Sequence, residues 1–324
     1  MSPLDALGLA PMAADMERVE TALRGSVLSS DPFLSDVAGH LVSAGGKRLR
    51  PALTLCAAYA AKGVGPVTDD AITGGISVEL VHLGSLYHDD VIDEAETRRG
   101  VPSVNARWSN IVAILAGDYL LARASSLAAS LGADVAALLA ATIGELCRGQ
   151  VLELQHLFDA DRSVDTYVSA ISGKTASLFG TACRVGGMVS GVDDPTLDAL
   201  TQFGQHLGMC FQIVDDVLDV TATDEELGKP AGNDILEGVY TLPVIHALAA
   251  SPELRDLLGR KIDRSQLDTA RELVKSGDAV ERSIEAARGH AADASAVLAS
   301  TSSLDAEVVE GLIRLVDTLV TRQF

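Results

Sequence analysis

Residues 86–100 read LYHDDVIDEAETRRG, a run of acidic residues followed closely by two arginines. In a helix, Asp89 and Asp93 are four positions apart and project from one face, with Asp90 beside them. Like charges at this spacing repel each other, so a soluble fold has little reason to cluster them unless cations lie between them. Carboxylate oxygens are ligands for hard metal ions. The stretch therefore predicts a metal site on a long helix.

The two arginines of this stretch add a second kind of chemistry. Arg98 and Arg99 lie about two helical turns beyond the first acids, where the helix is expected to end in a loop at residues 100–102, GVP. Guanidinium groups bind phosphate through paired hydrogen bonds. Carboxylates for a metal and arginines for phosphate are together the ingredients of a metal–diphosphate site.

A second acidic stretch repeats the first pattern. Residues 211–219 read FQIVDDVLD, so that Asp215 and Asp219 again share a helix face, with Asp216 beside them. A solvated helix face with coincidental spacing is the alternative explanation. The apolar neighbours argue against it, because they leave the acids on a helix that is otherwise buried. Two such patterns in one chain favour a function.

The composition of the chain predicts an all-α fold. Of 324 residues, 48% are hydrophobic but only 4% are aromatic, so the core is mostly Ala, Leu and Val, which suits close helix packing. Apolar residues recur at three- and four-residue spacing without sustained alternation. We expect one domain over residues 1–324, a large helical bundle with a deep central cavity. The predicted helices span residues 12–28, 32–43, 49–62, 69–96, 104–130, 133–157, 164–173, 175–190, 194–221, 234–250, 252–262, 264–276, 278–299 and 303–321.

Charge and cysteine content limit the partners and the compartment. The net charge of −20 and the lack of a long Lys/Arg run argue against nucleic acid or an anionic membrane as the main partner. The most apolar stretch, 111–121, is broken by Gly117-Asp118 and is expected to be too short to span a bilayer. No signal peptide is evident, and we expect a cytoplasmic protein. Its isolated cysteines should be buried reduced thiols that bind no zinc: Cys56, Cys147, Cys183 and Cys210.

Basic residues near glycines are candidates for binding an anion. In residues 45–51, GGKRLRP, paired glycines allow backbone to approach a ligand, and Lys47 and Arg50 could reach one anion. By itself this is also an ordinary basic turn before a helix. The Lys174-Thr175 pair is a weaker signal. Lys229 lies on the irregular stretch after the second acidic helix, which could close over phosphate as a lid.

Polar residues on otherwise apolar helices are ambiguous. Gln150 and Glu153 could form a satisfied core pair. His82 is two turns before Asp89 on the same helix face, which makes it a candidate for the same cavity. The sequence gives no reason to assign a role to the other histidines considered: His40, His156, His206, His246 and His290.

These motifs together resemble those of the trans-isoprenyl diphosphate synthases. GGKRxRP, HDDxxD with RRG close behind, GQxxEL, KT, FQxxDDxxD and GKxxGxD occur in that family's order between about residues 45 and 243. The resemblance implies an all-α fold with a deep cavity, usually a homodimer. It also implies sequential condensation of isopentenyl diphosphate onto an allylic diphosphate primer, which could be dimethylallyl, geranyl, farnesyl or geranylgeranyl diphosphate.

The same resemblance assigns expected roles to the motif residues. Three Mg²⁺ ions per active site would be held by Asp89, Asp93, Asp215 and Asp219, with Asp90 and Asp216 close by as further catalytic residues. The allylic diphosphate would be bound or covered by Arg98, Lys174, Thr175, Gln212 and Lys229, with Lys174 also counted as catalytic. The isopentenyl diphosphate would be bound by Lys47, Arg50, His82 and Arg99.

Product length is expected to depend on the helix before the first acids. Short-chain relatives often have an aromatic floor four or five residues before the first aspartate, where this chain has Ser85 and Gly84, with Val81 one turn back. The absence of a bulky residue predicts a medium- or long-chain all-trans product, such as a quinone side-chain precursor. A geranylgeranyl or farnesyl product is the alternative, because a bulky residue on another helix could close the tunnel.

The chain departs from the pattern of this family at two positions, and its motifs also bear on two other functions. Val239 follows Glu-Gly where many relatives have lysine, which would remove one peripheral diphosphate contact, and Tyr87 replaces a more usual leucine. A terpene cyclase would not need the second diphosphate pocket of Lys47, Arg50 and Arg99. A non-catalytic subunit of a heteromeric synthase would be expected to have degraded acidic motifs, and both are intact.

Overall fold

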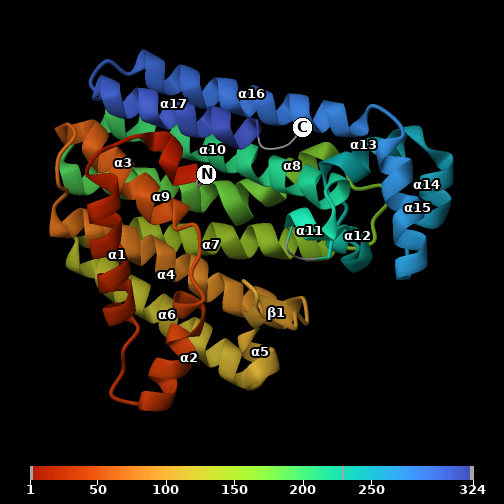
Figure 1. Ribbon diagram of the computed structural model, residues 1–324, viewed down its shortest axis with the longest axis horizontal. Coiled ribbons are helices and arrows are strands. Elements are labelled where there is room, and N and C mark those ends of the chain that lie inside the picture. Colours follow the sequence, from red (N-terminus) through yellow and green to blue (C-terminus); the bar gives the residue numbers. More distant parts are fainter. Residues whose placement is uncertain (1–2, 228–229, 322–324) are drawn as a thin grey trace. The chain divides into compact units, whose positions relative to one another are not determined.

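The computed structural model describes residues 3–227 and 230–321, and this part of the chain is helical apart from one pair of two-residue strands. It confirms the predicted all-α fold (Figure 1). The elements in order are η1 Pro3–Leu7, α1 Met12–Ser26, α2 Pro32–Ser43, α3 Leu49–Lys62, α4 Asp69–Ile92, β1 Thr97–Arg98, β2 Val101–Pro102, α5 Val104–Arg107, α6 Asn110–Ser130, α7 Ala133–Gln155, α8 Val164–Ile171, η2 Ser172–Ala176, α9 Ser177–Ser190, α10 Asp194–Thr221, α11 Asp224–Leu227, α12 Asn233–Glu237, α13 Leu242–Ala250, α14 Pro252–Leu257, α15 Arg264–Lys275, α16 Ala279–Ser300 and α17 Ala306–Val320.

The described residues form two compact units. The first draws on Met1–Ile143, Leu178–Gly204 and Ser295–Leu315, and the second on Gly144–Ser177, Gln205–Ala294 and Val316–Phe324. Helices α7, α9, α10, α16 and α17 contribute residues to both. Each unit is therefore described by itself, and one domain over residues 1–324 remains a prediction.

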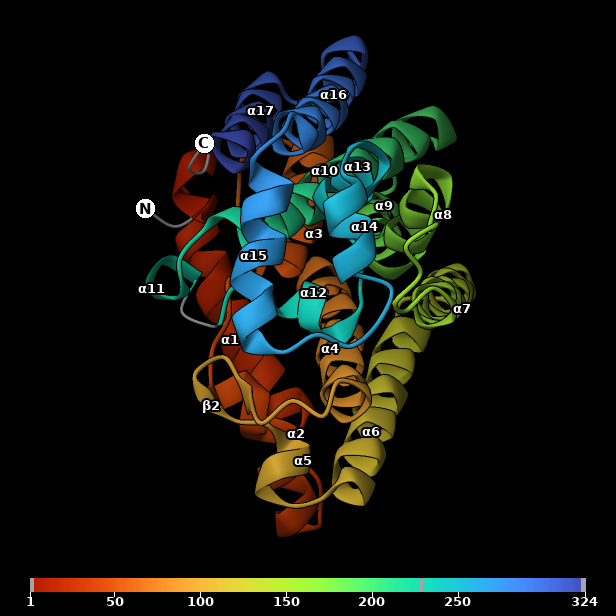
Figure 2. The same cartoon turned by 90° about the vertical axis from the view of Figure 1, so that its right-hand side faces the viewer.

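In the first unit, α4 is a central helix. It packs against α1, α3 and α6, and α4 and α6 lie side by side in both views (Figures 1 and 2). Small residues make the α4–α6 contact close, because a Cβ added at Gly84 would lie 3.1 Å from the backbone oxygen of Gly117. Helix α3 is apolar on all sides and is buried almost throughout, as this pattern requires. This packing fixes the end of α4, which carries the first acidic motif.

In the second unit, short helices gather around α13. It packs against α8, α14 and α15, and α15 also contacts α12 (Figure 2). Buried apolar residues of α13 and α15, such as Val244, Leu248 and Leu267, supply the core of this part. The C-terminal turns of α10, which carry the second acidic motif, belong to this unit.

Several predicted boundaries were wrong. Helix α4 ends at Ile92, not at residue 96, and the predicted single helices over 104–130 and 234–250 are each broken in two. The second break occurs because Gly238, with φ +81°, ends α12 before Pro243 starts the next helix. Three cysteines are buried and reduced as predicted, but Cys147 is exposed on α7.

Helices α6 and α7 are longer than the apolar stretch predicted from the sequence. They have 21 and 23 residues, and by length and composition alone each could cross a membrane. This is weak evidence for membrane insertion, since a core helix of a soluble protein passes the same test. Only 33% of the most apolar part of α6 and 22% of that of α7 are buried. Both helices therefore leave much apolar surface uncovered in the single chain.

Candidate active site

The first acidic motif stands at the C-terminal end of α4. The Asp93 N–H caps the helix by donating to the Asp89 carbonyl oxygen at 2.8 Å. Asp90 is fully buried, Asp89 is partly buried and Asp93 is exposed. Backbone carbonyls at a helix C-terminus carry partial negative charge, so three carboxylates there repel the helix end as well as one another. The position itself favours a bound cation.

A short hairpin brings Arg98 back onto this motif. Arg99 and Gly100, with φ of +54° and +74°, form the two-residue turn that joins β1 to β2, a conformation that suits such turns. Arg98 therefore lies in a strand rather than in the predicted loop. Its Nε and Nη2 both contact Asp90 Oδ1, at 2.7 and 2.6 Å. Burial raises the pKa of Asp90, and the Arg98 charge opposes that rise.

The glycines of the basic turn make room for Arg99. Gly46 has φ +146°, and a Cβ there would lie 2.9 Å from Cζ of Arg99. The Arg99 Nη1 group donates to the carbonyl oxygens of Leu41, at 3.1 Å, and Gly45. The basic turn and the RRG segment are therefore joined directly. Leu41 and Arg99, which make one of these contacts, are 58 residues apart in the sequence.

The three basic residues after these glycines have different environments. Arg48 is buried and pairs with Glu20 at 2.5 Å and Glu79 at 3.0 Å, which makes it a structural residue. The Arg50 guanidinium lies 4.8 Å from the centre of the Phe179 ring, and Lys47 is exposed. The choice of Lys47 and Arg50 as anion ligands is compatible with these positions and stays a prediction.

His82 lies among the arginines of the first unit. Burial, followed by the positive charges of Arg50 and Arg99, holds the pKa of its imidazole well below the ordinary value. Arg48 and Arg98 add to the same effect. The structure thus places three predicted isopentenyl diphosphate ligands, His82, Arg50 and Arg99, close enough to interact electrostatically, and the low pKa keeps His82 neutral.

The residues before the acids are packed unequally. Val81 is fully buried, and Gly84 is pressed against Gly117 and Leu121 of α6. Ser85 is partly exposed and donates to the His82 carbonyl oxygen at 2.9 Å. Tyr87 is buried and donates to the Val37 carbonyl oxygen at 2.8 Å, so this unusual residue ties α4 to α2.

In the second unit, a π-helical turn positions Lys174. The turn, η2, follows α8, and turns of this kind are frequent at functional sites. Gly149 of α7 packs so closely against this turn that a Cβ added at Gly149 would lie 2.4 Å from the backbone nitrogen of Lys174. Lys174 Nζ then donates to Glu153 Oε1 at 2.5 Å. Glu153 therefore holds this lysine, which explains the acid in the GQxxEL motif.

A chain of hydrogen bonds leads from this turn to the second acidic motif. Thr175 donates to Gln212 Oε1 at 2.7 Å, and Gln212 Nε2 donates to Asp216 Oδ1 at 2.8 Å. The Tyr167 hydroxyl donates to Asp216 Oδ2 at 2.5 Å. Burial raises the pKa of Asp216 to about 7, although both hydrogen bonds favour the ionised form.

Tyr167 and Arg162 are residues that the sequence analysis missed. The buried Arg162 guanidinium lies 5.7 Å from the centre of the Tyr167 ring and donates from Nη1 to the Tyr240 carbonyl oxygen at 3.0 Å. Neither residue belongs to a motif, and Tyr167 is 49 residues from Asp216. Only the regular apolar spacing of α8, which buries Tyr167, gave a signal in the sequence.

The other acids of this motif differ in exposure. Asp215 is exposed, whereas Asp219 is buried, and its Oδ2 accepts from the Asp234 N–H at 3.3 Å. Like the first motif, they lie in the last turns of a long helix. All four predicted metal ligands offer hard oxygen atoms, the donor type that Mg²⁺ prefers, so the residues fit that ion.

The predicted site residues divide between the two units. Asp89, Asp93, Arg98, Arg99, Lys47, Arg50 and His82 belong to the first unit, and Lys174, Thr175, Gln212 and the second acidic motif belong to the second. The prediction that the two acidic motifs face each other across a cavity therefore stays a prediction. Lys229 lies outside the described residues.

Comparison with known proteins identifies the class. Residues 31–276 match the family model described as polyprenyl synthetase. The chain therefore belongs to this family, and it is a prenyltransferase with the all-α isoprenoid synthase fold.

Particular relatives cover nearly the whole chain. A nonaprenyl diphosphate synthase of Mycobacterium tuberculosis is 39% identical over 325 residues, 98% of this chain and 95% of that protein. A solved polyprenyl synthase of Caulobacter crescentus CB15, complexed with calcium and isoprenyl diphosphate, has a TM-score of 0.92 and 34% identity over 99% of this chain and 98% of that one. A geranylgeranyl pyrophosphate synthase of Corynebacterium glutamicum, in a complex of the same kind, has a TM-score of 0.83 and 38% identity over 97% and 96%. A divalent metal ion is the cofactor class that these structures support.

Proposed function

We propose that this protein extends an allylic diphosphate with isopentenyl diphosphate to give a medium- or long-chain all-trans prenyl diphosphate. One observation carries the proposal: two aspartate motifs stand at the C-terminal ends of two long helices, where a buried acid in each is already held by the protein. A cation is stabilised near the C-terminal end of a helix, and the carboxylates there add to this attraction. The basic residues beside them then give diphosphate a place to bind.

The cofactor we propose is Mg²⁺, three ions per active site, held by Asp89, Asp93, Asp215 and Asp219. When bound, these ions would neutralise charge that grows on the leaving diphosphate. The protein's own cations, Arg98 and Lys174, would stabilise the same charge as the allylic C–O bond breaks. The isopentenyl double bond then attacks the allylic cation, and the departed diphosphate takes the final proton.

The described residues predicted to bind the allylic diphosphate are each hydrogen-bonded to a protein partner. Arg98 is held by Asp90 and Lys174 by Glu153, so their long side chains are ordered before substrate arrives. Such preorganisation lowers the entropic cost of binding. Thr175 and Gln212 are ordered in the same way. Lys47, Arg50, His82 and Arg99 would bind isopentenyl diphosphate, and Lys229 would cover the allylic group from the loop after α10.

Product length is the finer part of the proposal. The relatives named above include a nonaprenyl and a geranylgeranyl synthase at 39% and 38% identity, so similarity alone does not choose between a long and a shorter product. The small residues Ser85 and Gly84 favour the longer one. The test is purified protein with Mg²⁺, labelled isopentenyl diphosphate and each allylic primer, with products sized by chromatography. A C20 product overturns the medium- or long-chain assignment, and no condensation with any primer favours the heteromeric subunit.

Ser85 offers the cleaner test of the tunnel floor. A phenylalanine at Gly84 would collide with the α6 backbone, so a change in its product would mix packing with length. Ser85→Phe should shorten the main product by at least one isoprene unit, while Ser85→Ala should leave it unchanged. An unchanged product profile in Ser85→Phe would show that the floor lies elsewhere.

The protein is proposed to be a cytoplasmic homodimer. The exposed face of α6 carries Ile111, Ile114 and Leu115, with Ile111 and Leu115 exposed by 71% and 61%. Apolar side chains grouped this way mark an interface. A second copy of the chain would cover them. Leu115→Glu should give a monomer in sedimentation analysis, whereas Val164→Glu, at an exposed valine on α8, should remain a dimer. A dimeric Leu115→Glu would contradict this interface.

A further inference from the structure

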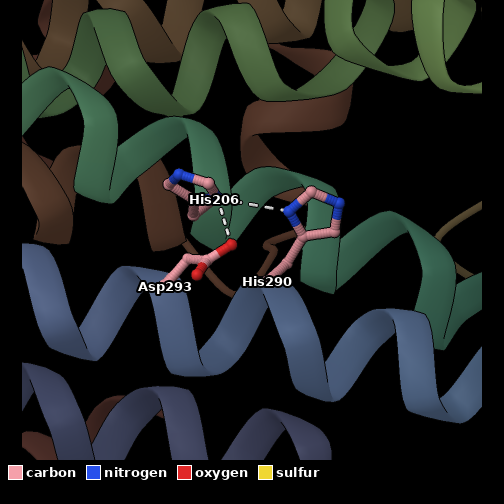
Figure 3. Close-up of side chains that lie close together, drawn as sticks. All are labelled: His206, His290 and Asp293. Atoms are coloured by element: carbon pink, nitrogen blue, oxygen red, sulfur yellow. Dashed lines mark hydrogen bonds and ion pairs between the residues drawn. The ribbon is translucent and has the colours of Figure 1, made fainter.

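A cluster of potential metal-ligating side chains shares no residue with either acidic motif. It consists of His206 on α10 with His290 and Asp293 on α16, all within the second unit (Figure 3). His206 Nδ1 lies 3.2 Å from His290 Nδ1 and 3.8 Å from Asp293 Oδ2. Among the residues that the structure describes, this is the group of three such side chains whose ligand atoms all lie within 4.8 Å of one another.

The spacing of these atoms is close to that of a tetrahedral metal site. Zinc binds imidazole nitrogen at about 2.0–2.1 Å and carboxylate oxygen at about 2.0–2.2 Å, so neighbouring ligand atoms of a tetrahedron are about 3.3–3.5 Å apart. The observed 3.2 and 3.8 Å lie on either side of this range. All three ligand atoms lie within 4.8 Å of one another, so side-chain rotation would have to shorten the longest separation, and each side chain is at least partly accessible.

The ligand chemistry separates this cluster from the aspartate motifs. Imidazole nitrogens suit zinc and related transition metals, whereas all-oxygen sites suit magnesium. Two imidazoles and one carboxylate give such an ion two nitrogen ligands and one negative charge.

We propose that His206, His290 and Asp293 form a binding site for a divalent transition-metal ion of the zinc class. Three protein ligands leave a fourth position for water or an external group. The ion would clamp α16 to α10. His206 is nine residues before Asp215, about 13.5 Å along the helix axis, so the clamp acts on the same helix as the second acidic motif without sharing its ligands. The inference does not depend on the proposed product.

The test measures Zn²⁺ binding in the presence of excess Mg²⁺, which fills oxygen-ligand sites. All proteins carry Cys147→Ser, because that exposed thiol is another soft ligand. Calorimetry should find one Zn²⁺ per chain, and Co²⁺ in its place should give the visible absorption of a tetrahedral ion. At a hundredfold excess over the dissociation constant, Zn²⁺ should raise the melting temperature by about 4 °C.

The variants decide where the ion binds. His206→Ala and His290→Ala should each weaken binding by at least about 100-fold and abolish the thermal shift. His206→Gln and His290→Gln, which keep polar side chains, should behave alike if alanine lowers metal-free stability. His156→Ala is the matched control. His156 pairs with Asp159 at 2.7 Å, three residues along the chain as Asp293 is from His290, but it lies outside the cluster. Equal binding by the His206 and His290 variants, or no Zn²⁺ binding above the Mg²⁺ background, overturns the proposal.

Discussion

The ends of α4 and α10 carry the same motif, but each holds its middle aspartate in a different way. Asp90 is fully buried and receives both Nε and Nη2 of Arg98 on one oxygen. Asp216 is also buried, but its donors are the uncharged side chains of Tyr167 and Gln212. Asp90 thus accepts hydrogen bonds from a charged side chain, whereas Asp216 accepts them from uncharged ones.

This difference shows how two copies of one motif can be tuned separately. Asp90 and Arg98 form an ion pair with little net charge, so an ion at the α4 end would be held mainly by Asp89 and Asp93. At the α10 end the neutral donors fix the geometry of Asp216 but supply no positive charge, and burial, with the nearby negative charges of Asp215 and Glu153, raises its pKa to about 7. A cation near the α10 motif would therefore relieve more repulsion. The following changes test this contrast.

The largest expected effect is on activity. Asp89→Asn and Asp215→Asn remove one carboxylate from each motif, and each should lower kcat/KM by about 10³-fold, close to the loss of a principal electrostatic contact in a transition state. The measurement is incorporation of labelled isopentenyl diphosphate over a range of Mg²⁺ concentrations. Asp70→Asn, at an exposed acid in the first turn of α4, is the control and should keep wild-type activity. Near-normal activity in either motif variant would remove that acid from the site.

Arg98→Met tests the charged partner of Asp90. It leaves a buried carboxylate without its counter-ion and should destabilise the fold by about 3–5 kcal/mol, measured by urea unfolding at pH 7.5. Arg255→Met breaks an exposed ion pair with Asp161 and should cost about 0–1 kcal/mol. Adding Asp90→Asn to Arg98→Met should restore much of the loss. A double variant as unstable as Arg98→Met alone would show that packing, not charge, is the cause.

Tyr167→Phe tests the neutral partner of Asp216. It removes one hydrogen bond to a buried carboxylate while Gln212 keeps the other, so the expected loss is about 1–3 kcal/mol in the same urea experiment. The control is Tyr119→Phe, whose hydroxyl donates to the Leu28 carbonyl oxygen at an exposed site and should matter little. A loss as large as that of Arg98→Met would erase the distinction between the two helix ends.

The sequence predicted what depends on local pattern. Apolar spacing located most helices, including the bounds of α3 and α10, and the repeated aspartate spacing located both motifs. It missed the hairpin at Arg98 because two-residue strands carry too few side chains to show alternation. The predicted end of α4 is four residues too late. Residues 93–96 are compatible with a helix by sequence, but in the fold they lead into the β1–β2 hairpin.

Contacts between distant segments were beyond the reach of sequence patterns. Tyr167 meets Asp216, and Tyr87 reaches Val37 across 50 residues, and neither tyrosine stands in a recognisable pattern with its partner. The sequence likewise gives no reason to assign a role to His206 and His290. They are 84 residues apart and come into contact only in the folded chain. Spacing predicts which side chains share a helix face, but packing decides which faces meet.

The smallest effect concerns His82, two helical turns before the first motif. Burial and the neighbouring arginines lower the pKa of His82 below its unfolded value of about 6.5, so the unfolded chain binds more protons below that pH. The contribution of neutral His82 is therefore complete above pH 6.5 and is lost as the pH falls toward the lower folded pKa, by up to about 1.4 kcal/mol per pH unit. Urea unfolding between pH 7.5 and 5.5 should show a shallower decline in His82→Gln than in the wild type, because glutamine does not titrate. Parallel curves would mean that a charged His82 is tolerated among these arginines, and the basic neighbourhood of the α4 end would then be weaker than its geometry indicates.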